Sequence, residues 1–247
     1  MLKISVITLC KNNEATIADA MRSFQTQDYP NKEHIVIDGA STDNTLYIIK
    51  QFNPDILQSE PDQGMYYAAN KGISLATGDI IAFLHADDIF ASNNVLSQMV
   101  SAIEQENSDA AYADLEYVAK ENVDKVVRYW HSGEFKPKRL KYGWMPPHPT
   151  FFAKKTAYES YGVFDTSYRI AADYDLMMRF VSKPGFKLTY CPITAVKMRT
   201  GGISNRSFRN ICQKMREDLR AARTNKIGGI VTLIFKNLRK LGQFFCR

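Results

Sequence analysis

Two adjacent carboxylates, Asp87 and Asp88, carry the strongest sign of chemistry in the sequence, and only His85 and Ala86 separate them from a short apolar run. The run, residues 80–84 (IIAFL), is partly β-branched, as buried strands are. Open α/β sheets place ligand sites at the carboxyl ends of their strands. Because neighbouring carboxylates repel each other, the pair predicts a divalent cation that also holds substrate phosphates. A helix N-cap before Asn93 is the alternative interpretation.

Polar side chains also end the three preceding apolar runs. Thr8 lies at the end of residues 3–9, Asp38 follows residues 34–37, and Asp62 follows residues 55–59. Neither G-x-G-x-x-G nor G-x-x-x-x-G-K-[ST] is present, which disfavours dinucleotide dehydrogenases and P-loop enzymes. The converging acids therefore indicate a ligand site of another kind.

The first ninety residues predict strands that alternate with helices. Apolar residues recur at helical spacing after each of the first three strands. Short connections between alternating elements are typical of an α/β fold, with a mostly parallel sheet and helices on both faces. The predicted helices cover residues 14–26, 41–52 and 65–76.

The second half continues the same domain with a different pattern. Here the sequence predicts a hairpin over residues 116–131 and a helix over 170–180 that carries Asp173 and Asp175 in its first turn. Acids at this end of a helix are favoured by its dipole. Further helices are predicted at 93–105 and 155–161, and further strands at 109–114, 150–153, 187–190 and 194–198.

The composition suits one large globular domain with an anionic partner. The chain has 247 residues, a net charge of +6 and a pI near 9.0, so a nucleotide, nucleic acid or an acidic membrane surface would each fit. The four cysteines lack C-x-x-C spacing, which argues against zinc and favours a reducing cytosol. No signal peptide and no apolar run of membrane-spanning length is found, so we expect a cytoplasmic protein.

Residues 205–247 form a basic tail after the domain at 1–204. The tail holds eleven Lys or Arg and only two acids, Glu217 and Asp218. A helix is predicted at 209–222. A second, at 230–245, has basic residues interleaved with one apolar face. Such a helix can lie on an anionic bilayer or pack on the domain with its basic face in solvent, and both interpretations stay open. The apolar face comprises Ile230, Ile234, Leu238, Leu241 and Phe245.

Five stretches in this order resemble family 2 glycosyltransferases, which are inverting enzymes of the GT-A fold that use nucleotide sugars. The likeness runs from about residue 3 to residue 204. It is nearest to the bacterial enzymes that build surface polysaccharide and O-antigen units. The stretches are SVITLCKN, IDGASTDNT, EPDQGMYYAANKGI, GDIIAFLHADD and FDTSYRIAADYDLMMRF.

The resemblance implies a role for each matching position. Thr8 and Asp38 would contact uracil or ribose. Asp62 and Lys71 would lie around the base and diphosphate. Asp88 would be the main ligand of Mn²⁺ or Mg²⁺, with Asp87 reaching the ribose or a metal-bound water. The sequence departs from the family pattern at Gly39 and Ala172, where many relatives carry an acid, and at His85, where a small polar residue is usual.

Asp173 falls at the family's catalytic base. A single in-line displacement at the anomeric carbon needs a base for the acceptor hydroxyl, and a metal-bound diphosphate as leaving group. A helix cap is the alternative role of Asp173, and Asp175 is the alternative base, although it is well placed to pair with Arg179. His148 would touch the diphosphate or acceptor, or cap its Pro-rich loop, and Trp144 would stack on a sugar or pack at the rim.

The sequence therefore predicts a metal-dependent inverting glycosyltransferase. We expect it to move a sugar from a UDP-sugar, or a similar donor, to a hydroxyl of a lipid-linked saccharide. It would work in the cytoplasm, and under the membrane interpretation of the tail it would be a peripheral protein of the inner membrane face. The alternatives are a sugar nucleotidyltransferase and a non-catalytic carbohydrate-binding or scaffold protein. Nucleic acid is not expected as a partner, because no recognition motif accompanies the basic tail.

Overall fold

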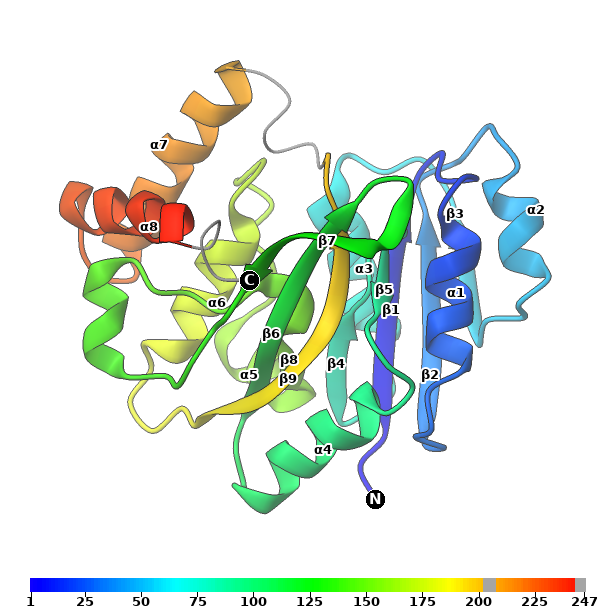
Figure 1. Ribbon diagram of the computed structural model, residues 1–247, viewed down its shortest axis with the longest axis horizontal. Helices are drawn as coiled ribbons and strands as arrows, with labels where there is room; N and C mark the ends of the chain where they lie inside the picture. Colours follow the sequence, from blue (N-terminus) through cyan, green and yellow to red (C-terminus); the bar gives the residue numbers. More distant parts are fainter. Residues whose placement is uncertain (202–207, 243–247) are drawn as a thin grey trace.

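The computed structural model describes residues 1–201 and 208–242, and a nine-stranded sheet forms its centre (Figure 1). Four strands in the order β3-β2-β1-β4 are parallel, and helices connect them. This confirms the predicted alternation. The strands are β1 (Ile4–Cys10), β2 (Lys32–Asp38), β3 (Ile56–Ser59) and β4 (Ile80–Phe83), and the helices are α1 (Ile17–Gln25), α2 (Thr45–Lys50) and α3 (Met65–Leu75).

Both faces of this parallel half are covered by helices, as predicted. Side chains alternate along β1, so Val6 packs with Phe24 of α1, whereas Ile7 packs with Ile73 of α3. The approach of α3 is close, because a Cβ added to Gly72 would lie 2.6 Å from Ile7 Cγ2. The buried, parallel strands β1–β4 thus bring the polar residues at their carboxyl ends to one edge of the sheet.

The second half of the sheet is mixed rather than parallel. β8 (Phe152–Lys154) runs antiparallel between β4 and β6 (Ala110–Ala119), and β6 forms the predicted hairpin with β7 (Asn122–Trp130). β9 (Leu188–Arg199) is parallel to β6 and antiparallel to β5 (Asp88–Phe90). The helices of this part include α4 (Val95–Gln105) and α5 (Lys155–Tyr161).

One long strand, β9, replaces the two strands predicted at 187–190 and 194–198. Its pairing with β6 continues on both sides of a register shift, where Tyr112 pairs with Tyr190 and Asp114 with Thr194. The irregularity accommodates Pro192, which has no N–H to donate to a ladder. The prediction of two strands was wrong because a bulge absorbs the proline without ending the strand.

The tail packs on the domain through two helices, α7 (Phe208–Thr224) and α8 (Ile230–Gly242). α7 packs on α6 (Ala172–Val181), and α8 packs on α7 and on the 3-10 helix η1 (Pro137–Tyr142). Gly143 permits this contact. Its φ is +68°, and a Cβ added to it would lie 2.4 Å from the backbone nitrogen of Lys236. The end of the predicted helix, residues 243–247 with Phe245, lies outside the described residues.

Within residues 1–201 and 208–242, no helix combines the length and the apolar character needed to cross a bilayer.

Candidate active site

Asp88 is a buried carboxylate with one oxygen left without a hydrogen-bond partner. It opens β5 and is 1% exposed, and its Oδ1 accepts the Arg199 N–H at 3.2 Å, while Oδ2 has no partner. Burial raises the pKa of Asp88 well above its usual range, and the charge of Asp87 adds to this effect. The N-cap interpretation of this pair was wrong, because α4 begins only at Val95 with Asn94 as its N-cap. An orphaned buried oxygen beside a second acid fits a cation.

Arg199, to which the sequence analysis gave no role, clamps this acidic loop. Its Nη1 donates to the Asp87 carbonyl at 2.9 Å, and its Nη2 donates to Asp19 Oδ2 at 2.6 Å. Its Nε donates to the Lys120 carbonyl at 3.1 Å. Thus one buried side chain at the end of β9 holds the Asp87–Asp88 backbone, α1 and the β6–β7 turn together.

Thr8 and Asp38 are fully buried and already have partners. The Thr8 hydroxyl lies 2.9 Å from His34 Nε2. Asp38 accepts hydrogen bonds from the Ser41 N–H at 3.0 Å, from the Ser59 hydroxyl at 2.6 Å and from the Ser41 hydroxyl. These side chains therefore support the loops after β1 and β2. Their placement argues against the direct nucleotide contacts expected of them, because neither presents a polar atom at the surface.

Asp62 and Lys71 form a partly open ion pair beside α3. Lys71 Nζ lies 2.8 Å from Asp62 Oδ1 and also pairs with Glu60. Its hydrogen bonds to Asp62 and then Glu60 raise the pKa of Lys71. Asp62 Oδ2 is buried without a hydrogen-bond partner. The pair therefore combines a partly exposed cation with a carboxylate oxygen that has no partner within the described residues.

Two half-buried histidines, His85 and His148, lie within electrostatic reach of Asp173. The rings of His85 and His148 are 5.9 Å apart between centroids, and His148 also contacts Phe83 and Phe164. Burial lowers the pKa of His148 to about 4 and also lowers that of His85, which lies within electrostatic reach of Asp87 and Asp173. Both imidazoles are thus neutral near pH 7. His148 comes from the 3-10 helix η2 (His148–Thr150).

Asp173 occupies the first turn of α6, and distant parts of the chain hold it there. The Tyr66 hydroxyl lies 3.4 Å from Asp173 Oδ1 and donates to the Ile170 carbonyl at 2.7 Å. Glu217 of α7 accepts the N–H groups of Arg169, Ile170 and Ala171 at 3.1, 2.8 and 2.9 Å. Although burial raises its pKa, these bonds lower the pKa of Glu217 overall. The tail thus caps the helix that carries the predicted base.

Asp175 has a structural role. Its Oδ2 pairs with Arg179 Nη2 at 3.0 Å, as the spacing predicted, and its Oδ1 accepts from Asn225 Nδ2 at 2.9 Å. Arg179 in turn donates to the Tyr161 carbonyl at 2.7 Å. Asp175 therefore ties α6 to its neighbours, and Asp173 is the carboxylate of this turn that faces the cavity described next.

A cavity of about 390 Å³ opens beside Asp173. Tyr117 and Trp130 line it from the β6–β7 hairpin, with their rings stacked at 6.5 Å between centroids. Lys236 lines it from α8 and pairs with Asp218 at 2.7 Å. Aromatic faces beside hydrogen-bonding and charged groups suit a sugar acceptor. Other lining residues are Arg128, Met145, His148, Ile170, Met198, Thr200 and Lys214.

Trp130, not Trp144, presents its ring to this cavity. Trp144 is buried, packs its ring against Tyr112 and Phe135, and donates its indole N–H to the Ser132 carbonyl at 3.0 Å. That placement contradicts the expectation that Trp144 contacts an acceptor, because core side chains cover its ring. No sequence pattern separated the two tryptophans.

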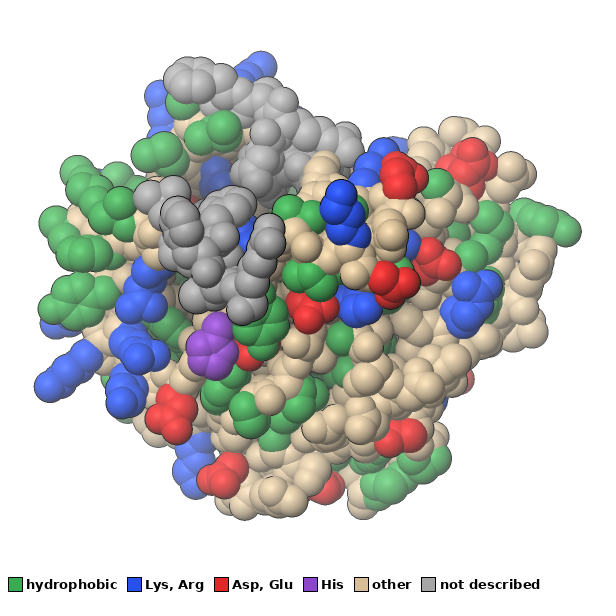
Figure 2. Space-filling view, in the orientation of Figure 1, with side chains coloured by type: hydrophobic (Ala, Val, Ile, Leu, Met, Phe, Trp, Pro, Cys, Tyr) green, Lys and Arg blue, Asp and Glu red, His purple; other side chains and the backbone are tan. Residues whose placement is uncertain are grey.

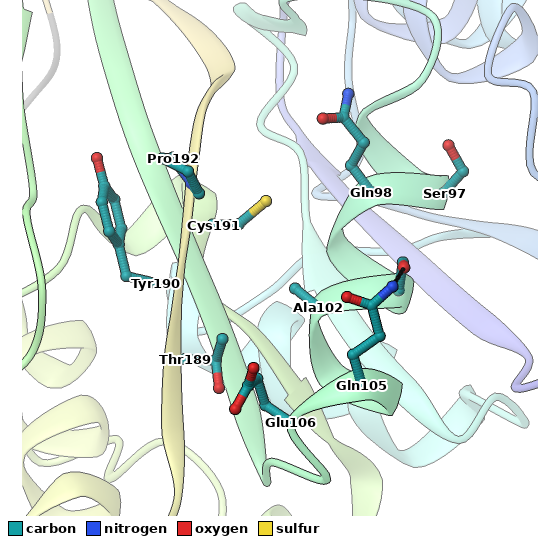
Figure 3. A pocket seen from close by; sticks show the side chains of 10 residues that line it. Ser97, Gln98, Ala102, Gln105, Glu106, Thr189, Tyr190, Cys191 and Pro192 are labelled. Carbon is teal, nitrogen blue, oxygen red and sulfur yellow. Dashed lines mark hydrogen bonds between the residues drawn. The ribbon is translucent and has the colours of Figure 1, made fainter.

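A larger hollow of about 560 Å³ lies elsewhere, between α4 and β9 (Figure 3). Its lining includes Gln98, Gln105, Glu106 and Cys191. Among the described residues that line this hollow there is no predicted site residue. We take the smaller cavity as the candidate active site. Asp173 and His148 line it, and so does Arg199, which donates to the Asp87 carbonyl.

The sequence matches the profile described as Glycosyl transferase family 2 over residues 5–170. A PGL/p-HBAD biosynthesis glycosyltransferase of Mycobacterium bovis is 30% identical over 208 residues, covering 81% of this chain and 78% of the relative. The Escherichia coli UDP-Glc:alpha-D-GlcNAc-diphosphoundecaprenol beta-1,3-glucosyltransferase WfgD is 31% identical over 123 residues, covering 49% and 48%.

Two solved structures share the fold at low sequence identity. Residues 1–349 of S. aureus TarS, in complex with UDP-GlcNAc, superpose with a TM-score of 0.68 at 18% identity, over 89% of this chain and 66% of that one. A Pyrobaculum calidifontis mannosyltransferase in complex with GDP-Man and Mn²⁺ gives a TM-score of 0.67 at 18% identity, over 98% and 69%. Both likenesses support the predicted GT-A fold.

Proposed function

Because the chain belongs to glycosyl transferase family 2, we propose that it moves one sugar from a nucleotide-sugar donor to a saccharide hydroxyl with inversion. One observation carries this proposal. Asp173 and His148 line one cavity together with the stacked rings of Tyr117 and Trp130, and His148 contacts His85, which lies within electrostatic reach of Asp87 and Asp173. Such an arrangement places a donor diphosphate and an acceptor hydroxyl on opposite sides of one reacting carbon.

The donor is a UDP-sugar. WfgD is named for UDP-Glc, and TarS was solved with UDP-GlcNAc. In this chain Lys71 supplies a cation for the diphosphate, and the unpartnered Asp62 Oδ2 supplies an acceptor for the nucleoside. Asp87 reaches the ribose or the hydration shell of the metal.

Asp88, with Asp87 beside it, would hold a divalent ion, Mn²⁺ or Mg²⁺. The buried, unpartnered Asp88 Oδ2 fits a cation, and these ions take one or two carboxylates together with substrate phosphates. The mannosyltransferase that shares the fold was solved with Mn²⁺. When bound, the ion supplies Lewis-acid stabilisation of the leaving diphosphate.

Asp173 is the base. The acceptor oxygen forms a bond to the anomeric carbon as the bond from that carbon to the phosphate oxygen breaks, and the hydroxyl proton passes to the Asp173 carboxylate. The Tyr66 hydroxyl and the Glu217 cap hold this carboxylate in place. One displacement of this kind inverts the anomeric centre.

The acceptor is a saccharide carried on a lipid diphosphate, and the protein works as a peripheral protein at the inner face of the cell membrane. WfgD is named for such an acceptor. The cavity beside Asp173 offers Tyr117 and Trp130 to sugar rings, and Lys214 to anionic groups. An acceptor of this class places the protein in surface-polysaccharide synthesis.

Calorimetric titration of UDP with and without Mn²⁺ tests the proposal. We expect binding that depends on the metal, and its loss in Asp88→Ala. Glu106→Ala, in the hollow of Figure 3, serves as the control and should bind like the wild type. If UDP, GDP and dTDP all fail to bind the wild type, the transferase proposal is wrong and a non-catalytic carbohydrate-binding or scaffold protein becomes the better interpretation.

A further inference from the structure

Helix α8 carries its apolar residues on the side that faces away from the protein. Ile230, Val231, Ile234 and Leu238 are 61%, 63%, 52% and 53% exposed. A helix packed on a globular domain normally turns its apolar stripe toward the core. Here that stripe lies in solvent, and the helix is attached by other residues.

The buried side of α8 is mostly polar. It consists of Thr232, Leu233 and Lys236, at 2%, 7% and 5% exposure. The Thr232 hydroxyl donates to the Lys141 carbonyl at 2.9 Å, and Lys236 Nζ pairs with Asp218 at 2.7 Å. Hydrogen bonds and an ion pair thus fix the orientation of α8, so the exposed stripe is held in a defined position.

The stripe continues onto η1. Tyr142 is 53% exposed, and its ring meets Phe235, which is 38% exposed, edge to face at 5.5 Å between centroids. Figure 2 shows hydrophobic side chains gathered at the left of the molecule, over α8. We call the set the α8 face. It comprises Tyr142, Ile230, Val231, Ile234, Phe235 and Leu238.

Cations border the α8 face. Residues 136–141 contribute Lys136, Lys138, Arg139 and Lys141 and contain no acid. Blue side chains lie directly below the apolar group in Figure 2. Burial lowers the pKa of Arg239, and the nearby charge of Arg139 lowers it further. An anionic partner would reduce the electrostatic repulsion between these two guanidinium groups.

This charge pattern favours a bilayer over a second copy of the chain. Two α8 faces that met about a twofold axis would bring two basic rims together, since an isologous interface pairs one surface with itself. A bilayer with anionic headgroups instead takes apolar side chains at the acyl boundary and cations at its surface.

We propose that the α8 face is a membrane-docking surface that inserts into an anionic phospholipid bilayer. The docking surface consists of residues of α8 and η1 alone. The function that we give to docking rests on the proposed lipid-linked acceptor. The opposite side of the same helix places Lys236 in the wall of the cavity that holds Asp173. Docking through α8 would therefore bring the acceptor cavity, which Lys236 of the same helix lines, close to the membrane surface.

Co-sedimentation of the full chain with vesicles tests this proposal. We expect binding to phosphatidylglycerol-containing vesicles, weaker binding to pure phosphatidylcholine, and a decrease as salt is raised. The double variant Ile234→Ser/Leu238→Ser should lower the partition coefficient by at least roughly tenfold. The matched control, Tyr47→Ser/Val126→Ser, removes two apolar side chains of similar exposure from other surfaces and should bind like the wild type.

Three outcomes would overturn the proposal: a wild type that ignores anionic vesicles, a double variant that binds them equally well, or a wild-type dimer that the double variant disperses. The last would assign the α8 face to a second copy. UDP titration keeps this result separate from the proposed function. The Ile234→Ser/Leu238→Ser variant should still bind UDP, and Asp88→Ala should still bind vesicles.

Discussion

The donor side and the acceptor side of the cavity are built in different ways. On the donor side, each acid follows a strand, and most of the bonds that hold Asp38 and Asp62 come from the parallel half of the sheet, as from Ser41 and Lys71; only the Asp87–Asp88 loop is held from afar, by Arg199. On the acceptor side, Asp173 is held by Tyr66, more than a hundred residues away, and by the tail. The donor site is thus a consequence of the parallel sheet, whereas the acceptor site depends on how late elements pack against it.

The two sides also differ in charge. On the donor side, burial and the charge of Asp87 raise the pKa of Asp88, so a bound cation would favour the ionised form of this pair. On the acceptor side, Lys214 brings positive charge to the cavity from the tail, and Lys236 is already paired with Asp218. Damage on the acceptor side should therefore impair transfer and leave donor binding intact.

Asp173→Asn should give the largest effect. An amide cannot take the acceptor proton, so kcat should fall by about 10²–10⁴-fold, while UDP affinity stays within about twofold of wild type. Initial rates and calorimetry measure the two quantities. Asp175→Asn is the control, since it should lower the melting temperature through loss of the Arg179 pair and retain most of the transfer rate. Equal loss of transfer in both variants would contradict the assignment of the base.

Gly143→Ala should detach the tail from the acceptor side. The new Cβ would meet the Lys236 backbone at a residue with φ +68°, so we expect a loss of about 2–5 kcal/mol in the free energy of unfolding. Gly185→Ala has a similar φ of +83° with no atom within 4 Å, and should cost about 1–2 kcal/mol. Urea unfolding compares the two. Similar losses would show that α8 does not rest on Gly143.

Glu217→Ala should have the smallest effect of the three. It leaves three backbone N–H groups before α6 without their acceptor, at a cost of about 1–3 kcal/mol because water replaces part of the bonding. We expect kcat to fall several-fold with little change in UDP affinity, because Asp173 loses its fixed position. Glu217→Gln, which keeps one acceptor oxygen, should recover part of both losses.

The acid side of the stability profile offers a second measurement on Glu217. The folded protein holds the pKa of Glu217 below its unfolded value, so this contribution is complete above about pH 4.3 and is lost as the pH falls through the folded pKa. The Glu217→Ala variant should lack this part of the acid limb. An identical pH dependence in both proteins would show that Glu217 does not cap α6 in solution.

The sequence by itself determined the donor side. Apolar runs that alternate with amphipathic helices leave few topologies open, and parallel strands bring their carboxyl ends to one edge whatever packs beyond them. The Asp87–Asp88 pair, the helix that carries Asp173 and the Asp175–Arg179 pair could therefore be predicted from local spacing. Burial was not predictable in the same way: Thr8 and Asp38, which were expected to contact uracil or ribose, are fully buried.

Only the tertiary structure decided the acceptor side. The sequence could not choose between Trp130 and Trp144, could not assign His85 or Arg199, and could not indicate that Glu217, one of the tail's two acids, caps α6. Each of these depends on contacts between segments far apart in the chain, and no local period encodes such contacts. The same holds for α8. Its pattern predicted an amphipathic helix, but packing alone determined that Lys236 faces inward and the apolar stripe faces solvent.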